Sequence, residues 1–502
     1  MKSAALVVAV TVGSWICATA QTEHAEIAPQ AKDSLPLSAK STKVLKLVDQ
    51  AWVLDSDRGE LKKSIEVMRR VVKMDPKFAM GHEILAQISL DPAEQVKEQA
   101  LASATRRNAT AAEQTVIDWF QNAADHKLIP AITSMNEVLA QYPHDRWLVF
   151  LANSWLMQQM QYKRGAEVYE ASGIKNSPGL MNNVAYTYAH MRQFKKAFAL
   201  MEQYVKLMPH EANPNDSYAE LLRMAGQYEA AVEHYRAALA INPQFYTSAY
   251  GIADTYLLMG EEVRAREEYK KAFEKFPSVP EGEYVQWKTR EATTYLYEND
   301  ISNANTAFES LAEYAHSKHM SQVEADTYRQ MALYQTRSDK ARQLLRKAEA
   351  ALAEGKSVSP AGIHQEMAQI LRARVEVAIK IGDTRSVATA VARLSDLSNK
   401  YGDDRIIESS YQGAEGARLF QAQRYKEAIA HLEEDADNPL SLNRLAVAYR
   451  RSGYISGAKR TEETLANFND PTVEQALIVP AFRKCLQQRN CDLAVKNAAL
   501  TR

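Results

Sequence analysis

Small and large apolar residues recur with a period of 34 residues through the middle of this chain. Pro209, Pro243 and Pro277 stand 34 residues apart, and each closes a block with similar internal spacing. The block before Pro243 carries its marks at Ala219, Leu222, Gly226, Ala231, Tyr235 and Ala238. Adding 34 gives Ala253, Tyr256, Gly260, Ala265, Tyr269 and Ala272, so five of the six positions are identical. The pattern predicts a series of similar helical units.

The spacing inside one block predicts two helices joined by a short turn. Ala219 lies 12 residues before Ala231, so each falls in the middle of a helix, with a turn at residues 225–227. Small side chains at these positions let the two helices approach closely. The proline at the end of the block stops the second helix, because it lacks an N–H and clashes with the preceding turn. One hairpin cannot bury its apolar face alone, so several must stack.

These residue types and offsets resemble the tetratricopeptide repeat, which has small and aromatic marks in a first helix and Ala, Tyr and Pro in and after a second. The resemblance implies an all-α fold, a right-handed superhelical solenoid of antiparallel helix hairpins. It is most specific over residues 177–277 and weaker over residues 292–311 and 416–458. We expect one solenoid over residues 41–354, a break at residues 355–362, and further helical repeats over residues 363–502.

The N-terminus has the three parts of a secretory signal peptide. Lys2 supplies the positive charge, Ala4 to Ile16 an apolar run, and Ala18-Thr19-Ala20 a cleavage site. We therefore expect residues 1–20 to be removed and the chain to be exported, to a bacterial periplasm or otherwise secreted. The apolar run is too short for stable membrane insertion. A lipoprotein signal ending at Cys17 is the alternative, disfavoured by the bulky residue before it. Residues 21–40 are polar and contain two prolines, which predicts a flexible leader.

Composition and sequence motifs argue against several classes of function. The chain has 502 residues with a formal net charge of -1, which argues against a nucleic-acid partner. Glycine-rich phosphate loops and the motifs of hydrolases and zinc proteases are missing from the sequence, so no enzyme activity, cofactor or metal is expected. His316 and His319 are three residues apart, but two imidazoles without a third ligand make a weak metal site.

Cys485 and Cys491 are the only cysteines after the signal segment. Export would place them in an oxidising compartment, where disulfides persist. Within one continuous helix they would be about 9 Å apart in rise alone, too far for a bridge. A turn at Asn490 would allow a disulfide that joins the last two helices, and a free thiol pair or a metal site is the alternative.

One stripe on the first helices lies away from the packed alanines and is the candidate peptide-binding groove. Its members repeat every 34 residues and are spaced by four within each helix. They are Asn182, Tyr186, His190, Asp216, Glu220, Tyr250 and Asp254. With three carboxylates and no Lys or Arg, the stripe would suit a partner segment that bears basic residues.

The sequence therefore predicts an exported, non-catalytic scaffold that binds another protein or peptide through the concave face of the solenoid. A solvated face without a ligand is the simpler interpretation of the same stripe. Two other functions stay open: a structural protein of the cell envelope that self-associates, and a non-catalytic helical region attached to an enzyme complex.

Overall fold

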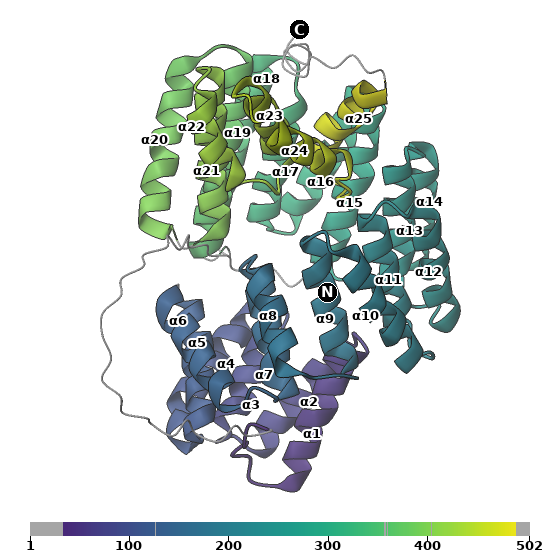
Figure 1. Ribbon diagram of the computed structural model, residues 1–502, viewed down its shortest axis with the longest axis vertical. Coiled ribbons are helices and arrows are strands. Elements are labelled where there is room, and N and C mark those ends of the chain that lie inside the picture. Colours follow the sequence, from purple (N-terminus) through teal and green to yellow (C-terminus); the bar gives the residue numbers. More distant parts are fainter. Residues whose placement is uncertain (1–33, 126, 356–357, 359, 403, 488–502) are drawn as a thin grey trace. The chain divides into compact units, whose positions relative to one another are not determined.

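The structure is a computed structural model that describes residues 34–125, 127–355, 358, 360–402 and 404–487. These residues form α-helices joined by short connections, and no strand occurs among them. The chain divides into two compact units, Met1–Leu221 and Leu222–Arg502, which we call unit 1 and unit 2. The prediction of an all-α solenoid of antiparallel hairpins is confirmed (Figure 1).

Unit 1 consists of helices that pack against their neighbours in sequence as antiparallel pairs. Its core gathers apolar residues from successive hairpins, with Trp119, Met68 and Leu148 almost fully buried. The helices are α1 (Thr42–Trp52), the π-helix η1 (Val53–Asp57), α2 (Leu61–Met74), α3 (Ala79–Ile88), α4 (Pro92–Thr105), the 3₁₀ turn η2 (Arg106–Asn108), α5 (Ala111–Ala124), α6 (Leu128–Gln141), α7 (Arg146–Gln158), α8 (Tyr162–Ser172), α9 (Pro178–His190), α10 (Phe194–Leu207) and α11 (Asn213–Met224), which crosses the boundary between the units.

Residues 34–40 lie before the first helix and are fixed against unit 1. The backbone N–H of Leu35 donates to Asp145 Oδ2 at 2.7 Å, and the N–H of Lys40 donates to Asp75 Oδ2 at 2.8 Å. Asp145 also caps α7, because its other oxygen accepts from Trp147 N and Leu148 N. The prediction of a flexible leader is therefore wrong for residues 34–40, since side chains distant in sequence hold their backbone. Residues 21–33 lie outside the described residues.

Unit 2 has the same architecture, and several of its helices between α15 and α21 are longer, up to the 21 residues of α19. Successive first helices of its hairpins contact one another, as α17, α19, α21 and α23 do in turn. We call the face formed by first helices the inner face of a unit. The helices are α12 (Tyr228–Ile241), α13 (Tyr246–Met259), α14 (Glu262–Lys275), α15 (Glu281–Tyr297), α16 (Ile301–Ser317), α17 (Ser321–Tyr334), α18 (Ser338–Glu354), α19 (Pro360–Lys380), α20 (Thr384–Tyr401), α21 (Arg405–Gln421), α22 (Tyr425–Glu433), α23 (Pro439–Arg451), α24 (Ile455–Ala466) and α25 (Val473–Gln487).

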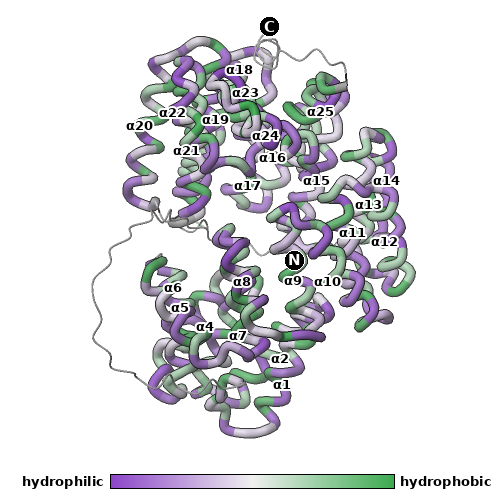
Figure 2. Tube along the Cα trace, viewed as in Figure 1, coloured by the Kyte–Doolittle hydropathy of each residue, from purple (hydrophilic) through white to green (hydrophobic). Residues whose placement is uncertain are grey.

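The residues that mark the 34-residue repeat are buried where the helices of a hairpin meet. Ala231, Ala253 and Ala265 have no exposed surface, and Tyr269 is equally buried. Gly226 and Gly260 fill the turns with φ of +78° and +82°, a conformation that glycine adopts without steric cost. Apolar and hydrophilic positions alternate along the helices throughout each unit (Figure 2).

The break expected at residues 355–362 is not the boundary between the units. It is the connection between α18 and α19, which pack against each other inside unit 2. The contacts thin out at Leu221 and Leu222 instead, within α11. The expected break therefore falls between two helices of one unit, whereas the division between the units falls within the regular helix α11.

Candidate functional site

Buried pairs of arginine and carboxylate lie along the inner face of unit 2. In each pair both side chains are no more than about one-sixth exposed, so the ions are largely removed from water. The pairs are Arg290 with Asp254, Arg329 with Glu366, Arg372 with Asp435, and Arg444 with Glu376. Each pair joins two helices or connections that are distant in sequence, so the pairs fix the register of the stacked hairpins.

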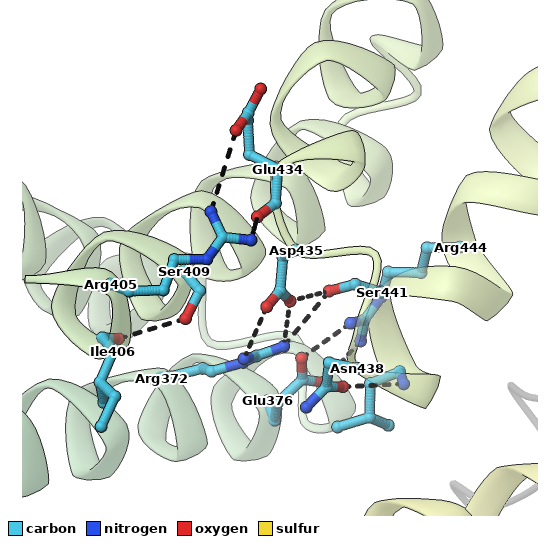
Figure 3. Close-up of polar contacts among 11 residues, drawn as sticks. Arg372, Glu376, Arg405, Ile406, Ser409, Glu434, Asp435, Asn438, Ser441 and Arg444 are labelled. Carbon is cyan, nitrogen blue, oxygen red and sulfur yellow. Dashed lines mark hydrogen bonds and ion pairs between the residues drawn. The ribbon is translucent and has the colours of Figure 1, made fainter. Parts of the chain in front are cut away.

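Two of the pairs, Arg372 with Asp435 and Arg444 with Glu376, lie beside each other on α19 and form one network (Figure 3). Arg372 donates to both oxygens of Asp435 and to the Ser441 hydroxyl, and that hydroxyl donates to Asp435. One turn further along α19, Glu376 accepts two hydrogen bonds from Arg444 of α23, at 2.7 and 2.5 Å. Burial alone would raise the pKa of Glu376, but the Arg444 guanidinium outweighs it and holds this pKa below its ordinary value. The network therefore ties α19 to α23 through ionised groups.

A glycine makes room for this network. A Cβ atom at Gly413 of α21 would lie 2.4 Å from Asp435 Oδ2 and 2.8 Å from an Arg372 nitrogen. Any side chain at this position would therefore displace the ion pair.

A cavity of about 200 Å³ lies beside the network. Its lining comes from α17, α19, α21, the start of α23 and α25, and it includes Arg329, Arg372, Glu376, Asn438 and Glu474. Both arginines and Glu376 already pair with protein groups. The cavity is polar and large enough to hold water.

The helix α25, the last among the described residues, lies on the inner face of unit 2. It contacts α15 and α23, which belong to hairpins far apart in the sequence. Val473 and Ala476 join an apolar cluster with residues of α15, α17 and α19, and Phe482 packs with Leu442 of α23. The connection before α25 is held as well, because Asn469 accepts from the Tyr228 hydroxyl at 2.5 Å. A helical segment of the chain itself thus occupies the face on which a ligand was expected.

Three of the predicted groove residues come together in unit 1. Tyr186 of α9 donates its hydroxyl to Glu220 of α11 at 2.8 Å, and Asp216 lies one turn before Glu220 on α11. All three side chains are partly buried. Burial, followed by the two nearby carboxylates, raises the pKa of Tyr186 well above its ordinary value. We call Tyr186, Asp216 and Glu220 the acidic cluster.

The prediction that Asp254 belongs to a peptide-binding groove is wrong, because this carboxylate is buried and paired within the protein. It is 2% exposed, pairs with Arg290 of α15 and accepts a hydrogen bond from Tyr269. Tyr250 is fully buried and stacks on Trp287, with ring centroids 3.8 Å apart. Arg290 and Trp287 both come from α15, beyond the last of the regular 34-residue blocks.

The two remaining groove residues lie on α9. Asn182 is buried, and its Oδ1 atom has no hydrogen-bond partner among the described residues. His190 is exposed at the end of the helix and stacks on the Tyr162 ring at 4.7 Å. The residues of the predicted groove therefore lie in different environments. Among them, the acidic cluster is the part that keeps carboxylates near the surface.

Other predicted features are placed as follows. Cys485, near the end of α25, is disulfide-bonded, and its expected partner Cys491 lies outside the described residues, as does the signal segment. His316 is exposed and pairs with Glu324 at 3.0 Å. Among the described residues no group of His, Cys, Asp and Glu could hold a metal ion. None of the described helices is long and apolar enough to cross a bilayer.

The comparison with family models agrees with the helical hairpins of the structure. A family model described as tetratricopeptide repeat matches residues 222–286. No curated protein matches the sequence. The chain is similar to solved structures at low identity, beginning with a tetratricopeptide repeat protein from Parabacteroides merdae, at 14% identity over 61% of this chain and 99% of that one, with a TM-score of 0.35.

Two further structures show the range of these similarities. YrrB, a tetratricopeptide protein with an unusual peptide-binding site, is 14% identical over 43% of this chain and 94% of its own, with a TM-score of 0.26. PilW, a type IV pilus biogenesis factor, is 12% identical over 49% of this chain and 99% of its own, with a TM-score of 0.30. The family match identifies a tetratricopeptide repeat region at residues 222–286, and the neighbouring described helices form hairpins of the same kind.

Proposed function

We propose that this protein, which is built of tetratricopeptide repeats, is an exported, non-catalytic scaffold that binds another polypeptide through the inner face of its solenoid. Stacked helical hairpins create extended surfaces that suit this role. The observation that carries the proposal is α25, a helical segment whose apolar residues pack among the first helices of unit 2. An inner face that holds one polypeptide helix in this way has the shape and apolar character to recognise polypeptide.

The acidic cluster of unit 1 is the surface that we assign to the external partner. The inner face of unit 2 holds α25, whereas Tyr186, Asp216 and Glu220 keep part of their surface exposed. Two carboxylates close together attract a segment that carries Lys or Arg, and such attraction contributes to both association rate and specificity. The partner is therefore a protein with a basic segment.

Charge reversal in the acidic cluster tests this assignment. We expect Asp216→Lys combined with Glu220→Lys to weaken binding of the partner by about tenfold or more, which corresponds to about 1.4 kcal/mol. The measurement is affinity capture from an envelope extract with residues 21–502 as bait, followed by titration of the captured protein. Glu66 and Glu137 are exposed on the second helices α2 and α6, so Glu66→Lys with Glu137→Lys changes the net charge equally and should not affect capture.

Three results would contradict parts of the proposal. Equal loss in both double variants would show a nonspecific charge effect. Equal capture by all three proteins would move the binding surface away from the acidic cluster. A concentration-dependent oligomer by light scattering, with no captured partner, would favour self-assembly over a scaffold role.

Export rests on the three-part pattern of residues 1–20 in the sequence. We expect the protein isolated from an exporting bacterial host to begin at Gln21, which the intact mass would report. A mass that retains Lys2 and the apolar run would contradict cleavage.

A further inference from the structure

A second pocket lies on the inner face of unit 1, apart from the acidic cluster. It encloses about 50 Å³ and is lined by residues of α1, η1, α2, α3, α5 and α7. Trp52, Phe120 and Phe150 are buried in its walls, and Trp147 is partly exposed at its edge. Because a single water needs about 10–15 Å³, the space holds a small group of a few heavy atoms.

Glu83 of α3 lines this pocket and has no exposed surface. Its Oε1 atom accepts a hydrogen bond from Gln87 Nε2 at 2.8 Å, whereas Oε2 is buried without a hydrogen-bond partner among the described residues. A buried carboxylate is normally paired with a cation or surrounded by donors. No Lys or Arg side chain is among the residues that line the pocket. Glu83 is therefore a buried acid without a cationic partner in the described part of the chain.

A second carboxylate, Asp55, enters the pocket from the π-helix η1. The neighbouring residue Asp57 fixes η1, because its side chain accepts from Gly179 N at 2.9 Å and its backbone carbonyl accepts from the Tyr204 hydroxyl at 2.6 Å. Isolated π-helical turns are rare and occur frequently at functional sites. Burial raises the pKa of Asp55 to about 6 and that of Glu83 to about 7, since the lining supplies no positive charge to offset desolvation.

Aromatic rings surround the two acids. Trp52 of α1 lies 5.3 Å from the Trp147 ring and 4.7 Å from the Phe150 ring, in tilted and edge-on arrangements. The face of an aromatic ring attracts a cation, most strongly for tryptophan, and the attraction increases when water is excluded. Carboxylates and aromatic faces in one small pocket are complementary to an organic cation, which combines a positive charge with apolar methylene groups.

We propose that this pocket binds an alkylammonium group, with Glu83 and Asp55 as its counter-charges and Trp52 and Trp147 as its aromatic walls. This inference depends on the proposed scaffold function in one respect only, namely which molecule supplies the alkylammonium group. A lysine side chain of a bound polypeptide and a free alkylamine share this chemistry. A compact ammonium head on a methylene chain suits the pocket better than a planar guanidinium that needs several carboxylate oxygens in its plane.

The proposal includes a proton step. In the empty pocket near pH 6.5 Glu83 is largely protonated, and an ammonium ion beside it favours the carboxylate. Binding therefore releases a proton from Glu83 to the solvent while the ligand keeps its own charge. Asp55 and Glu83 are the titratable side chains among the lining residues, so these two account for the release.

The experiment is calorimetric titration of the full mature chain with n-butylammonium chloride at pH 6.5, in two buffers of different ionisation enthalpy. We expect binding that releases protons, and at least tenfold weaker binding to Glu83→Gln and to Asp55→Asn. Glu66→Gln, an exposed acid on α2, is the matched control and should bind as the unaltered protein does. Neutral 1-butanol should bind at least tenfold more weakly than butylammonium.

A short peptide, acetyl-Gly-Lys-Gly-amide, and its Nε-acetylated form distinguish the two sources. Tighter binding of the unmodified peptide than of butylammonium supports a lysine of a polypeptide. Binding of butylammonium without binding of the peptide supports a free amine. Equal binding of butanol and butylammonium, or unchanged affinity in Glu83→Gln, would overturn the proposal. Capture of a partner that depends on Asp216 and Glu220 could still succeed in that case, so the two proposals fail separately.

Discussion

Replacing Arg444 by methionine is expected to destabilise unit 2 by about 3–5 kcal/mol, because it leaves the buried Glu376 carboxylate without its cation. The Arg444 side chain is 16% exposed and donates to both oxygens of Glu376, so water cannot replace it. The loss should appear as faster hydrogen exchange of backbone amides in α19 and α23, the two helices that the pair joins. Methionine keeps most of the volume, so the effect reports the charge.

An exposed pair of the same geometry provides the control. Arg424 also donates twice to one carboxylate, that of Glu427, but both side chains are about half exposed. Arg424→Met should therefore cost less than about 1 kcal/mol. Combining Arg444→Met with Glu376→Met should recover much of the lost stability, since no ion remains buried. A double variant as unstable as Arg444→Met alone would show that packing, not charge, is the cause.

Replacing Glu83 by glutamine is expected to stabilise unit 1 by about 3 kcal/mol at pH 8 and to leave its stability nearly unchanged at pH 4. Glu83 has a pKa of about 7 in the folded chain against an ordinary value of 4.5. Its contribution to stability is therefore complete below pH 4.5 and is lost as the pH rises through 7, because the folded state must then bury a charge. Urea unfolding followed by tryptophan fluorescence measures this change, because four of the five tryptophans among the described residues, Trp52, Trp119, Trp147 and Trp155, lie in unit 1.

Glu66→Gln should show neither the gain at pH 8 nor a changed pH dependence, because Glu66 is exposed. An equal gain for Glu83→Gln at both pH values would mean that Glu83 is already ionised at pH 4, which would remove the proton step from the ammonium proposal. A gain confined to high pH would show that the unaltered chain keeps a destabilising acid in its pocket. Natural sequences accept such a cost mainly where function requires it.

Much of the fold follows from spacing that a single sequence displays. The marks at Ala219, Ala231, Ala253 and Ala265 are local, because the two helices of a hairpin are adjacent in the chain and small residues are needed where they touch. The turn expected at residues 225–227 separates α11 from α12 as predicted. From α15 to α20 the hairpins are longer, so a fixed offset of 34 does not point to the correct neighbour in that part of the chain.

The candidate sites were less predictable, because their partners come from distant parts of the chain. The acidic cluster could be predicted from the sequence, since Tyr186 and Glu220 are separated by 34 residues, the length of one repeat. Arg290 lies 36 residues after Asp254, and Asp435 lies 63 residues after Arg372. Neither separation is a multiple of the 34-residue repeat, so the repeat does not predict these pairs. The only signal for such pairs is a charged residue at a position where the helix pattern requires an apolar one, and that signal does not name the partner.

The hydrogen bond between Tyr228 and Asn469 links residues that are 241 positions apart, and this separation sets an order of events in folding. In most solenoids each repeat contacts only its neighbours, so folding can start anywhere and spread. Unit 2 cannot complete its folding through contacts between neighbouring repeats alone, because α15 packs against α25, which is synthesised much later. At about 5–20 residues per second, synthesis takes roughly 10–50 s to supply those positions. During that interval the apolar inner face of α15 and α17 is uncovered and available to chaperones, so a helix synthesised late completes the first half of its unit.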